Sequence, residues 1–153
     1  MRKDVMISIK GTVVAESGLP DIIELVTAGR YYKKDGSFYI SYKESEATGL
    51  EGVTTTLKVD GQSSVTLIRN GNQRSRLVLE KGRRHQSLYD TGFGAMTVGV
   101  SGCKIKSCLN ELGGELVFNY TLDINSNTVS QNEVYVSVRE AGIKNVESYK
   151  LSN

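Results

Sequence analysis

The stretch Val53-Thr-Thr-Thr-Leu-Lys-Val-Asp-Gly61, followed by Val65-Thr-Leu-Ile-Arg-Asn-Gly71, decides the fold class of this chain. A face of Val, Thr, Leu and Val side chains alternates with Thr, Thr and Lys over residues 53–59, which is the period of a half-buried strand. Each run ends in Asp-Gly or Asn-Gly, dipeptides that favour the tight primed turns of hairpins, because glycine accepts a positive φ. The stretch is therefore predicted to form adjacent antiparallel strands.

The same alternation recurs along the chain, bounded by turn residues at roughly the 8 to 12 residue spacing of all-β domains. No segment shows helical periodicity. The predicted strands lie at residues 5–13, 21–26, 38–42, 53–59, 65–69, 74–80, 116–124 and 134–138, and shorter pieces separated by glycine lie at 85–89, 95–100 and 103–109.

Sequential antiparallel strands in this number must protect their edges, and closing the sheet into a barrel removes them. A two-sheet sandwich is the alternative, but it needs longer crossing connections than the tight turns at Asp35-Gly36, Asp60-Gly61 and Asn70-Gly71 supply. We predict an all-β, antiparallel meander of about eight to ten strands, closed by pairing of the first and last. This barrel would occupy residues 1–140 as a single domain, with 141–153 as a short C-terminal tail.

Composition agrees with one soluble domain, since the 153 residues are 39% hydrophobic and 24% charged. No run approaches the ~20 apolar residues of a membrane helix, so no membrane association is expected. The start, Met1-Arg2-Lys3-Asp4, leads into alternating residues and does not resemble a secretory signal. A cytoplasmic location is therefore expected.

The two cysteines, Cys103 and Cys108, are expected to be reduced thiols. Their odd offset places them on opposite faces of a continuous strand, with Cα atoms about 16 Å apart, which is beyond the reach of a disulfide. A disulfide is the weaker alternative, and it would need a bend between them.

The sequence contains few residues that could form a catalytic or metal-binding site. His85 is the one histidine and has no recognisable catalytic partner, and no Gly-x-Ser-x-Gly elbow occurs. One histidine and two badly spaced thiols do not make a tetrahedral zinc site. We predict that the protein is not an enzyme and needs no metal or cofactor.

Four segments resemble the YwiB-like family of small bacterial proteins over roughly residues 3 to 140: Tyr39-Ile-Ser-Tyr-Lys-Glu, Val65-Thr-Leu-Ile-Arg-Asn-Gly, Tyr89-Asp-Thr-Gly-Phe-Gly and Gly114-Glu-Leu-Val-Phe-Asn-Tyr-Thr-Leu-Asp. The resemblance implies a calycin-like, lipocalin-type barrel in a family whose biochemical role is unassigned. It therefore implies no catalytic residues. The chain has no tryptophan, so the Gly-x-Trp signature of lipocalins proper is missing.

A barrel of this size has an interior that is either filled by side chains or holds one small ligand. Extending the apolar inward rows along three predicted strands gives a candidate ligand site of Arg69, Glu44, Tyr42, Tyr120, Phe38 and Phe118. Because a buried charge is costly unless paired, Arg69 and Glu44 are predicted at or near the barrel mouth, as candidate partners of each other. Two interpretations stay open: the pair stabilises the barrel end without a ligand, or Arg69 holds an anionic group between tyrosine walls.

Charge segregation suggests a second kind of partner. Residues 65–108 hold eight Lys/Arg against two Asp/Glu, and the candidate polyanion-binding residues are Arg74, Arg76, Arg83 and Arg84. Adjacent hairpins would gather them into a patch for RNA or an acidic protein. The plain alternative is the ordinary charged exterior of a barrel, and no aromatic residue for base stacking lies between Arg69 and Arg84.

The aromatic and basic cluster Tyr31-Tyr32-Lys33-Lys34 is interpreted as a solvated hairpin end. The sequence thus supports a small-molecule binding barrel, with a polyanion-binding module as the alternative. Whether the protein is a monomer or a homodimer through its edge strands stays open.

Overall fold

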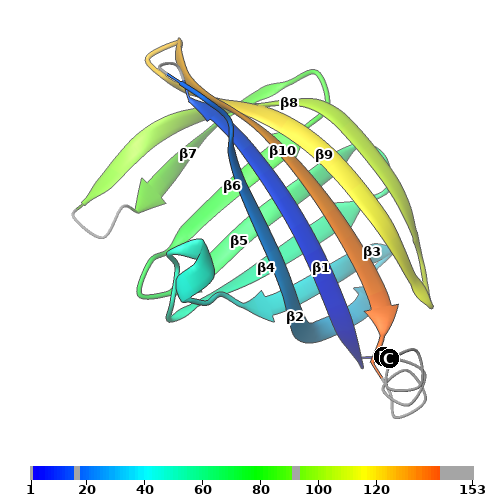
Figure 1. Ribbon diagram of the computed structural model, residues 1–153. Coiled ribbons are helices and arrows are strands. Elements are labelled where there is room, and N and C mark those ends of the chain that lie inside the picture. The colour runs from blue at the N-terminus through cyan, green and yellow to red at the C-terminus, as the bar shows by residue number, and fades with distance from the viewer. Residues whose placement is uncertain (1, 16–17, 91–93, 142–153) are drawn as a thin grey trace.

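The chain forms one antiparallel sheet of ten strands that closes on itself, as the computed structural model in Figure 1 shows. The structure describes residues 2–15, 18–90 and 94–141, so the predicted tail lies outside the described residues except for Ala141. The strands are β1 (Arg2–Ala15), β2 (Asp21–Lys34), β3 (Ser37–Lys43), β4 (Val53–Asp60), β5 (Ser64–Gly71), β6 (Ser75–Glu80), β7 (Arg84–Asp90), β8 (Ala95–Asn110), β9 (Gly113–Ile124) and β10 (Asn127–Glu140). Within these ranges the helical residues are one short 3₁₀ turn, η1 (Glu46–Thr48), and no helix has the length and apolar character needed to span a membrane.

The barrel closes through its first and last strands. Each strand pairs with its sequence neighbours, and β1 also pairs with β10 from Val5 opposite Glu140 to Ala15 opposite Ser130. Blue β1 and orange β10 lie side by side in Figure 1. An ion pair of 2.8 Å between Lys3 and Glu140 joins the ends of this seam. The predicted all-β meander and its closure are confirmed, whereas the calycin-like classification stays a prediction.

Strand β8 is longer than the sequence indicated. It runs unbroken through the two segments predicted at 95–100 and 103–109, with a β-bulge between Gly102 and Lys104. A bulge adds one residue to a strand and shifts the alternation of its faces. Cys103 and Cys108 are accordingly both exposed free thiols. The prediction of free thiols is confirmed, but their placement on opposite faces is wrong.

Strand β2 also extends past the predicted segment, through Lys34. The interpretation of residues 31–34 as a solvated hairpin end is therefore wrong for Tyr31, which is 1% exposed. Tyr31 continues the inward row of Ile23 and Leu25, and its hydroxyl donates to the carbonyl of Asn110 at 2.7 Å.

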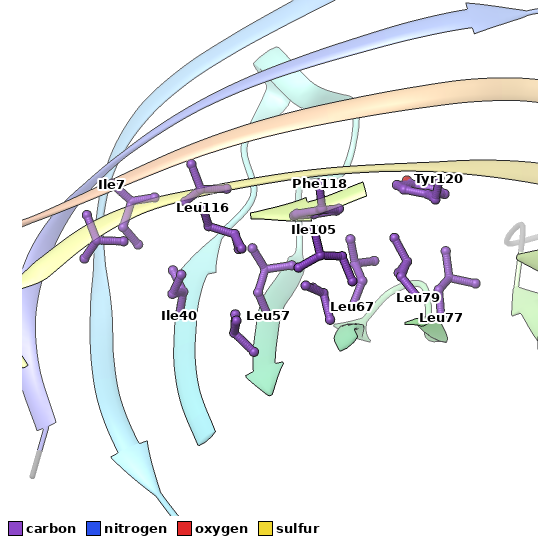
Figure 2. Packing of buried hydrophobic residues seen from close by; sticks show 14 of the residues in the cluster. Ile7, Ile40, Leu57, Leu67, Leu77, Leu79, Ile105, Leu116, Phe118 and Tyr120 are labelled. Carbon is purple, nitrogen blue, oxygen red and sulfur yellow. The ribbon is translucent and has the colours of Figure 1, made fainter. Parts of the chain in front are cut away.

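The interior is packed along most of its length. Figure 2 shows buried side chains from strands around the barrel meeting along its axis, among them Ile7, Ile40, Leu57, Leu77 and Leu116. Burial alternates almost perfectly in β4, where residues 53, 55, 57 and 59 are buried and their neighbours half-buried. The apolar rows predicted from the sequence therefore do face inward, and a cavity lies where polar residues join them at one end.

Candidate functional site

A cavity of about 150 Å³ lies at the barrel end where β3 and β5 finish and β4 and β10 start. Its polar lining includes Arg69, Glu44, Tyr42, Tyr120 and Asn132, and its apolar lining includes Leu57, Leu67 and Phe118. An engineered cavity of about this volume holds benzene. The space therefore suits a compact small molecule rather than a long lipid chain.

The hydrogen-bonded wall of the barrel is incomplete beside this cavity. Within the described residues, β2 meets β3 only from Gly29 onward, so residues 21–28 pair with β1 alone. Ile23 and Leu25 of that segment line the cavity together with Thr48 and Leu50, which lie in and just after η1. A short turn therefore stands here in place of a hydrogen-bonded strand.

Arg69 ends the inward row of β5, after Val65 and Leu67. Its Nε atom is buried, and no hydrogen-bond partner for it exists among the residues that the structure describes. A buried donor without a partner costs about 1–3 kcal/mol, and more when the group is charged. Arg69 is thus placed as predicted, with unused donor capacity inside the barrel.

Glu44 lies just past the end of β3 and is 8% exposed. The Oγ1 hydroxyl of Thr55, itself fully buried, donates to Glu44 Oε2 at 2.5 Å. Cross-strand pairing sets Thr55 between Tyr42 on β3 and Arg69 on β5. The strand register therefore supplies Glu44 with a neutral donor.

The predicted partnership of Arg69 and Glu44 is not present as an ion pair within the described part of the chain. Both side chains line the same cavity. The alternation of the sequence placed each residue correctly along its strand, but it did not reveal that Glu44 bonds to Thr55 instead of Arg69.

Two tyrosines complete the polar wall. Burial raises the pKa of the Tyr42 hydroxyl far above its usual range; the Glu44 carboxylate raises it further and Arg69 opposes the shift. Burial likewise raises the pKa of Tyr120, again opposed by Arg69. Tyr120 stacks on the fully buried Phe118 with ring centroids 6.2 Å apart. Both hydroxyls are therefore neutral at physiological pH and serve as hydrogen-bond donors or acceptors.

Phe38 does not line this cavity. It shares the inward face of Ile40 and Tyr42 but lies near the start of β3, where it stacks on Tyr31 with centroids 5.4 Å apart. Because β3 runs along the barrel wall, a shared face does not place Phe38 and Glu44 at the same end. Its inclusion in the ligand site was wrong for that reason.

Two polar residues of the site were missed. Asn132 is 8% exposed and continues the inward row of Val134, Val136 and Val138 on β10. Thr55 belongs to the inward row of β4. The alternation of inward and outward residues could have predicted both of them. It could not have predicted Thr48 and Leu50, which follow no strand pattern.

The four arginines proposed for polyanion binding are only partly available. Arg84 makes a bidentate pair with Asp123, with its Nε 2.9 Å from Oδ2 and its Nη2 2.7 Å from Oδ1. Arg83 lies 3.5 Å from Glu80, whose other oxygen lies 3.1 Å from Nε2 of the half-buried His85. Arg74 and Arg76 are exposed. Two of the four positive charges are thus offset by carboxylates.

Gly99 leaves room for the Arg84–Asp123 pair. A Cβ atom added at Gly99 would lie 2.4 Å from both the Arg84 guanidinium and Asp123 Oδ2. Gly99 pairs with Asp123 across β8 and β9, so the Arg84 side chain crosses β8 above it. The pair consequently links β7 to β9, and the Arg84 guanidinium is the main cause that lowers the pKa of Asp123.

We expect Asp123→Asn to lower the free energy of unfolding at pH 7 but to have much less effect at pH 3. A carboxylate whose pKa is lowered by folding adds stability above its unfolded pKa of about 4, and this contribution is lost as pH falls through the lowered value. Urea unfolding of both proteins at the two pH values measures the difference. Glu111→Gln, an exposed change in the β8–β9 turn, is the control. An equal loss at both pH values would contradict the assignment.

The comparisons with known proteins agree with this fold. The family model described as "Domain of unknown function (DUF1934)" matches residues 7–136. The "Uncharacterized beta-barrel protein YwiB" of Bacillus subtilis (strain 168) is 28% identical over 113 residues, covering 74% of this chain and 78% of that protein.

A solved structure is similar as well. The "Crystal structure of ywiB protein from Bacillus subtilis" matches with a TM-score of 0.76 and 23% identity, over 92% of this chain and 94% of that one. At this identity the match shows the shared barrel. The resemblance to YwiB-like proteins is thereby confirmed, and because the family model spans most of the barrel, the chain belongs to the DUF1934 family.

Proposed function

We propose that the barrel binds a small molecule with an anionic group, which Arg69 holds inside the cavity. The buried Arg69 Nε without a hydrogen-bond partner among the described residues is the observation that carries the proposal. A guanidinium presents parallel N–H groups that match carboxylate or phosphate oxygens. An anionic group at this position would accept a hydrogen bond from the Nε–H of Arg69 and would also offset the positive charge of the guanidinium.

The rest of the cavity supports binding of one compact molecule. Leu57, Leu67 and Phe118 offer apolar contact, while Tyr42 and Tyr120 offer neutral hydroxyls. A mainly apolar pocket with a few convergent polar groups is the usual composition of a small-molecule site. At about 150 Å³, the space suits a compact ligand, since an engineered cavity of similar volume holds benzene.

We infer binding rather than catalysis. Folding raises the pKa of both tyrosines, which makes them poor general bases at neutral pH. Glu44 already accepts the Thr55 hydroxyl. A polyanion-binding role has less support, because Arg83 and Arg84 are engaged with Glu80 and Asp123.

Native mass spectrometry of protein purified from a bacterial host tests the proposal. We expect the wild type to retain a small anion that Arg69→Ala lacks, while the exposed Arg76→Ala retains it. Titration with benzoate provides a defined probe of suitable size. Losing a charge-assisted hydrogen bond weakens binding by roughly tenfold or more, so Arg69→Ala should bind benzoate at least that much more weakly. Equal retention and equal benzoate affinity in Arg69→Ala would show that Arg69 is not the anion site.

A further inference from the structure

We infer that the ligand is a small zwitterion, whose ammonium group is held by Glu44 while Arg69 holds its carboxylate. This inference rests on the proposed function and specifies the class of ligand. It starts from two opposite charges that line one cavity without forming an ion pair among the described residues. Buried charges in proteins are normally paired with each other or with a ligand, because an isolated one is expensive to desolvate.

The register of β3, β4 and β5 gives Glu44 a hydrogen-bond partner other than Arg69. Thr55 lies directly between the strand positions of Tyr42 and Arg69, and its hydroxyl bonds to Glu44. Glu44 is held in place by this bond and by its backbone N–H, which donates to the carbonyl of Val53 at 2.8 Å. Residues of β4 therefore hold both the backbone of Glu44 and one of its carboxylate oxygens.

Both charged groups have capacity left for a ligand. A carboxylate offers about four acceptor positions, and the side chains of the described residues that bond to Glu44 are Thr55 and Tyr42. Arg69 keeps at least its Nε donor. An ammonium group donates three hydrogen bonds and a carboxylate accepts several, so a molecule carrying both would complement the two ends of the site.

Other ligand classes fit less well. A monoanion would bind to Arg69 but would be repelled by the negative charge of the buried Glu44 carboxylate. An amine would bind to Glu44 but would be repelled by the positive charge of Arg69. A ligand with two negative charges would add to the repulsion. Discrimination of this kind comes from the unfavourable term against the wrong partner as much as from contacts with the right one.

The carbon skeleton of such a zwitterion has suitable surroundings. Leu57 and Leu67 are cross-strand partners on β4 and β5, one inward position along from Thr55 and Arg69. Together with Phe118 they form an apolar surface below the polar groups, and Figure 2 shows Leu57, Leu67 and Phe118 close together in the interior. A short aliphatic chain between the two charges would lie against this surface.

The test is a matched series of probes measured by isothermal titration calorimetry at pH 7 and low salt. The zwitterions run from glycine through β-alanine and γ-aminobutyrate to 5-aminopentanoate, each compared with the carboxylate and the amine that share its carbon chain. At the best length we expect the zwitterion to bind at least about tenfold more tightly than its carboxylate counterpart, and the amine not to bind measurably.

Variants assign the two groups. In Glu44→Gln the zwitterion should weaken by about tenfold, whereas the matching carboxylate should bind more tightly because the repelling charge is gone. Arg69→Ala should weaken both. Glu24→Gln, an exposed change on the outer face of β2, is the control for loss of one negative charge. Circular dichroism and thermal unfolding verify that each variant is folded.

The outcomes separate this inference from the proposed function. Carboxylates that bind as tightly as zwitterions at every length, with dependence on Arg69, would overturn the zwitterion while leaving an anion-binding barrel. Loss of the zwitterion preference in Glu133→Gln rather than Glu44→Gln would overturn the role of Glu44, because Glu133 is the exposed carboxylate at the cavity. Failure of every probe to bind would overturn the inference, and the retained mass and benzoate affinity would then decide the proposed function on their own.

Discussion

Phe118→Ala is expected to lower the free energy of unfolding by about 3–5 kcal/mol. Phe118 is fully buried on β9, packs on Tyr120 and forms part of the cavity wall. Truncation removes a large apolar surface and leaves a void next to a space that is already open, so neighbouring side chains have little to collapse onto. A loss of this size is a large part of the total stability of an ordinary domain, about 5–15 kcal/mol.

Urea unfolding monitored by circular dichroism measures the loss, with Phe38→Ala as the matched control. Phe38 carries the same side chain but is only half-buried at the other end of β3. It should cost clearly less. Phe118→Leu, which retains most of the volume, should also be milder. Equal losses for Phe118→Ala and Phe38→Ala would show that the cavity end contributes no more to stability than the end of the barrel where Phe38 lies.

The second large effect is expected at Gly114, at the start of β9. Its φ is +132°, a conformation that other residues rarely adopt, and an added Cβ would lie 2.0 Å from the carbonyl oxygen of Cys108 on β8. Backbone strain of this kind costs of the order of 1–3 kcal/mol, and the clash with fixed backbone adds to it. We expect Gly114→Ala to lower the free energy of unfolding by at least about 3 kcal/mol.

Thermal and urea unfolding test this prediction against Gly18→Ala. Gly18 has no neighbour within 4 Å of an added Cβ and no positive φ, so the same change there should alter stability by less than about 0.5 kcal/mol. If Gly114→Ala were as mild as Gly18→Ala, the hairpin of β8 and β9 would have to be able to separate without loss of the barrel.

Most of the fold could be predicted from the sequence because most strands bury one face. In β4 the alternation of residues 53–59 survives unchanged in the folded protein, and the turn dipeptides mark the strand ends. Such patterns fix which side chains point inward, since the side-chain period of a strand is two. They identified Arg69, Glu44, Tyr42, Tyr120 and Phe118 as neighbours in one cavity.

What the pattern missed depends on position along and between strands. The bulge near Cys103 changes the phase without altering composition, and Gly29 and Thr27 interrupt the apolar row that would have announced buried Tyr31. That Glu44 bonds to Thr55 depends on the register that sets Thr55 between Tyr42 and Arg69. Register between strands is decided by turns and tertiary packing, and alternation alone does not contain it.

The pairing of β1 with β10 means that the barrel can close only after the last strand has been synthesised. Lys3 and Glu140, which meet there, are 137 residues apart. At about 5–20 residues per second, the ribosome needs roughly 7 to 27 s to deliver the last strand after the first. Until then β1 can pair only with β2, and its other edge offers unbonded backbone groups to any strand nearby. If folding begins before synthesis ends, the sheet is therefore open until β10 arrives, and a chaperone that covers the free edge of β1 would prevent it from pairing with other chains.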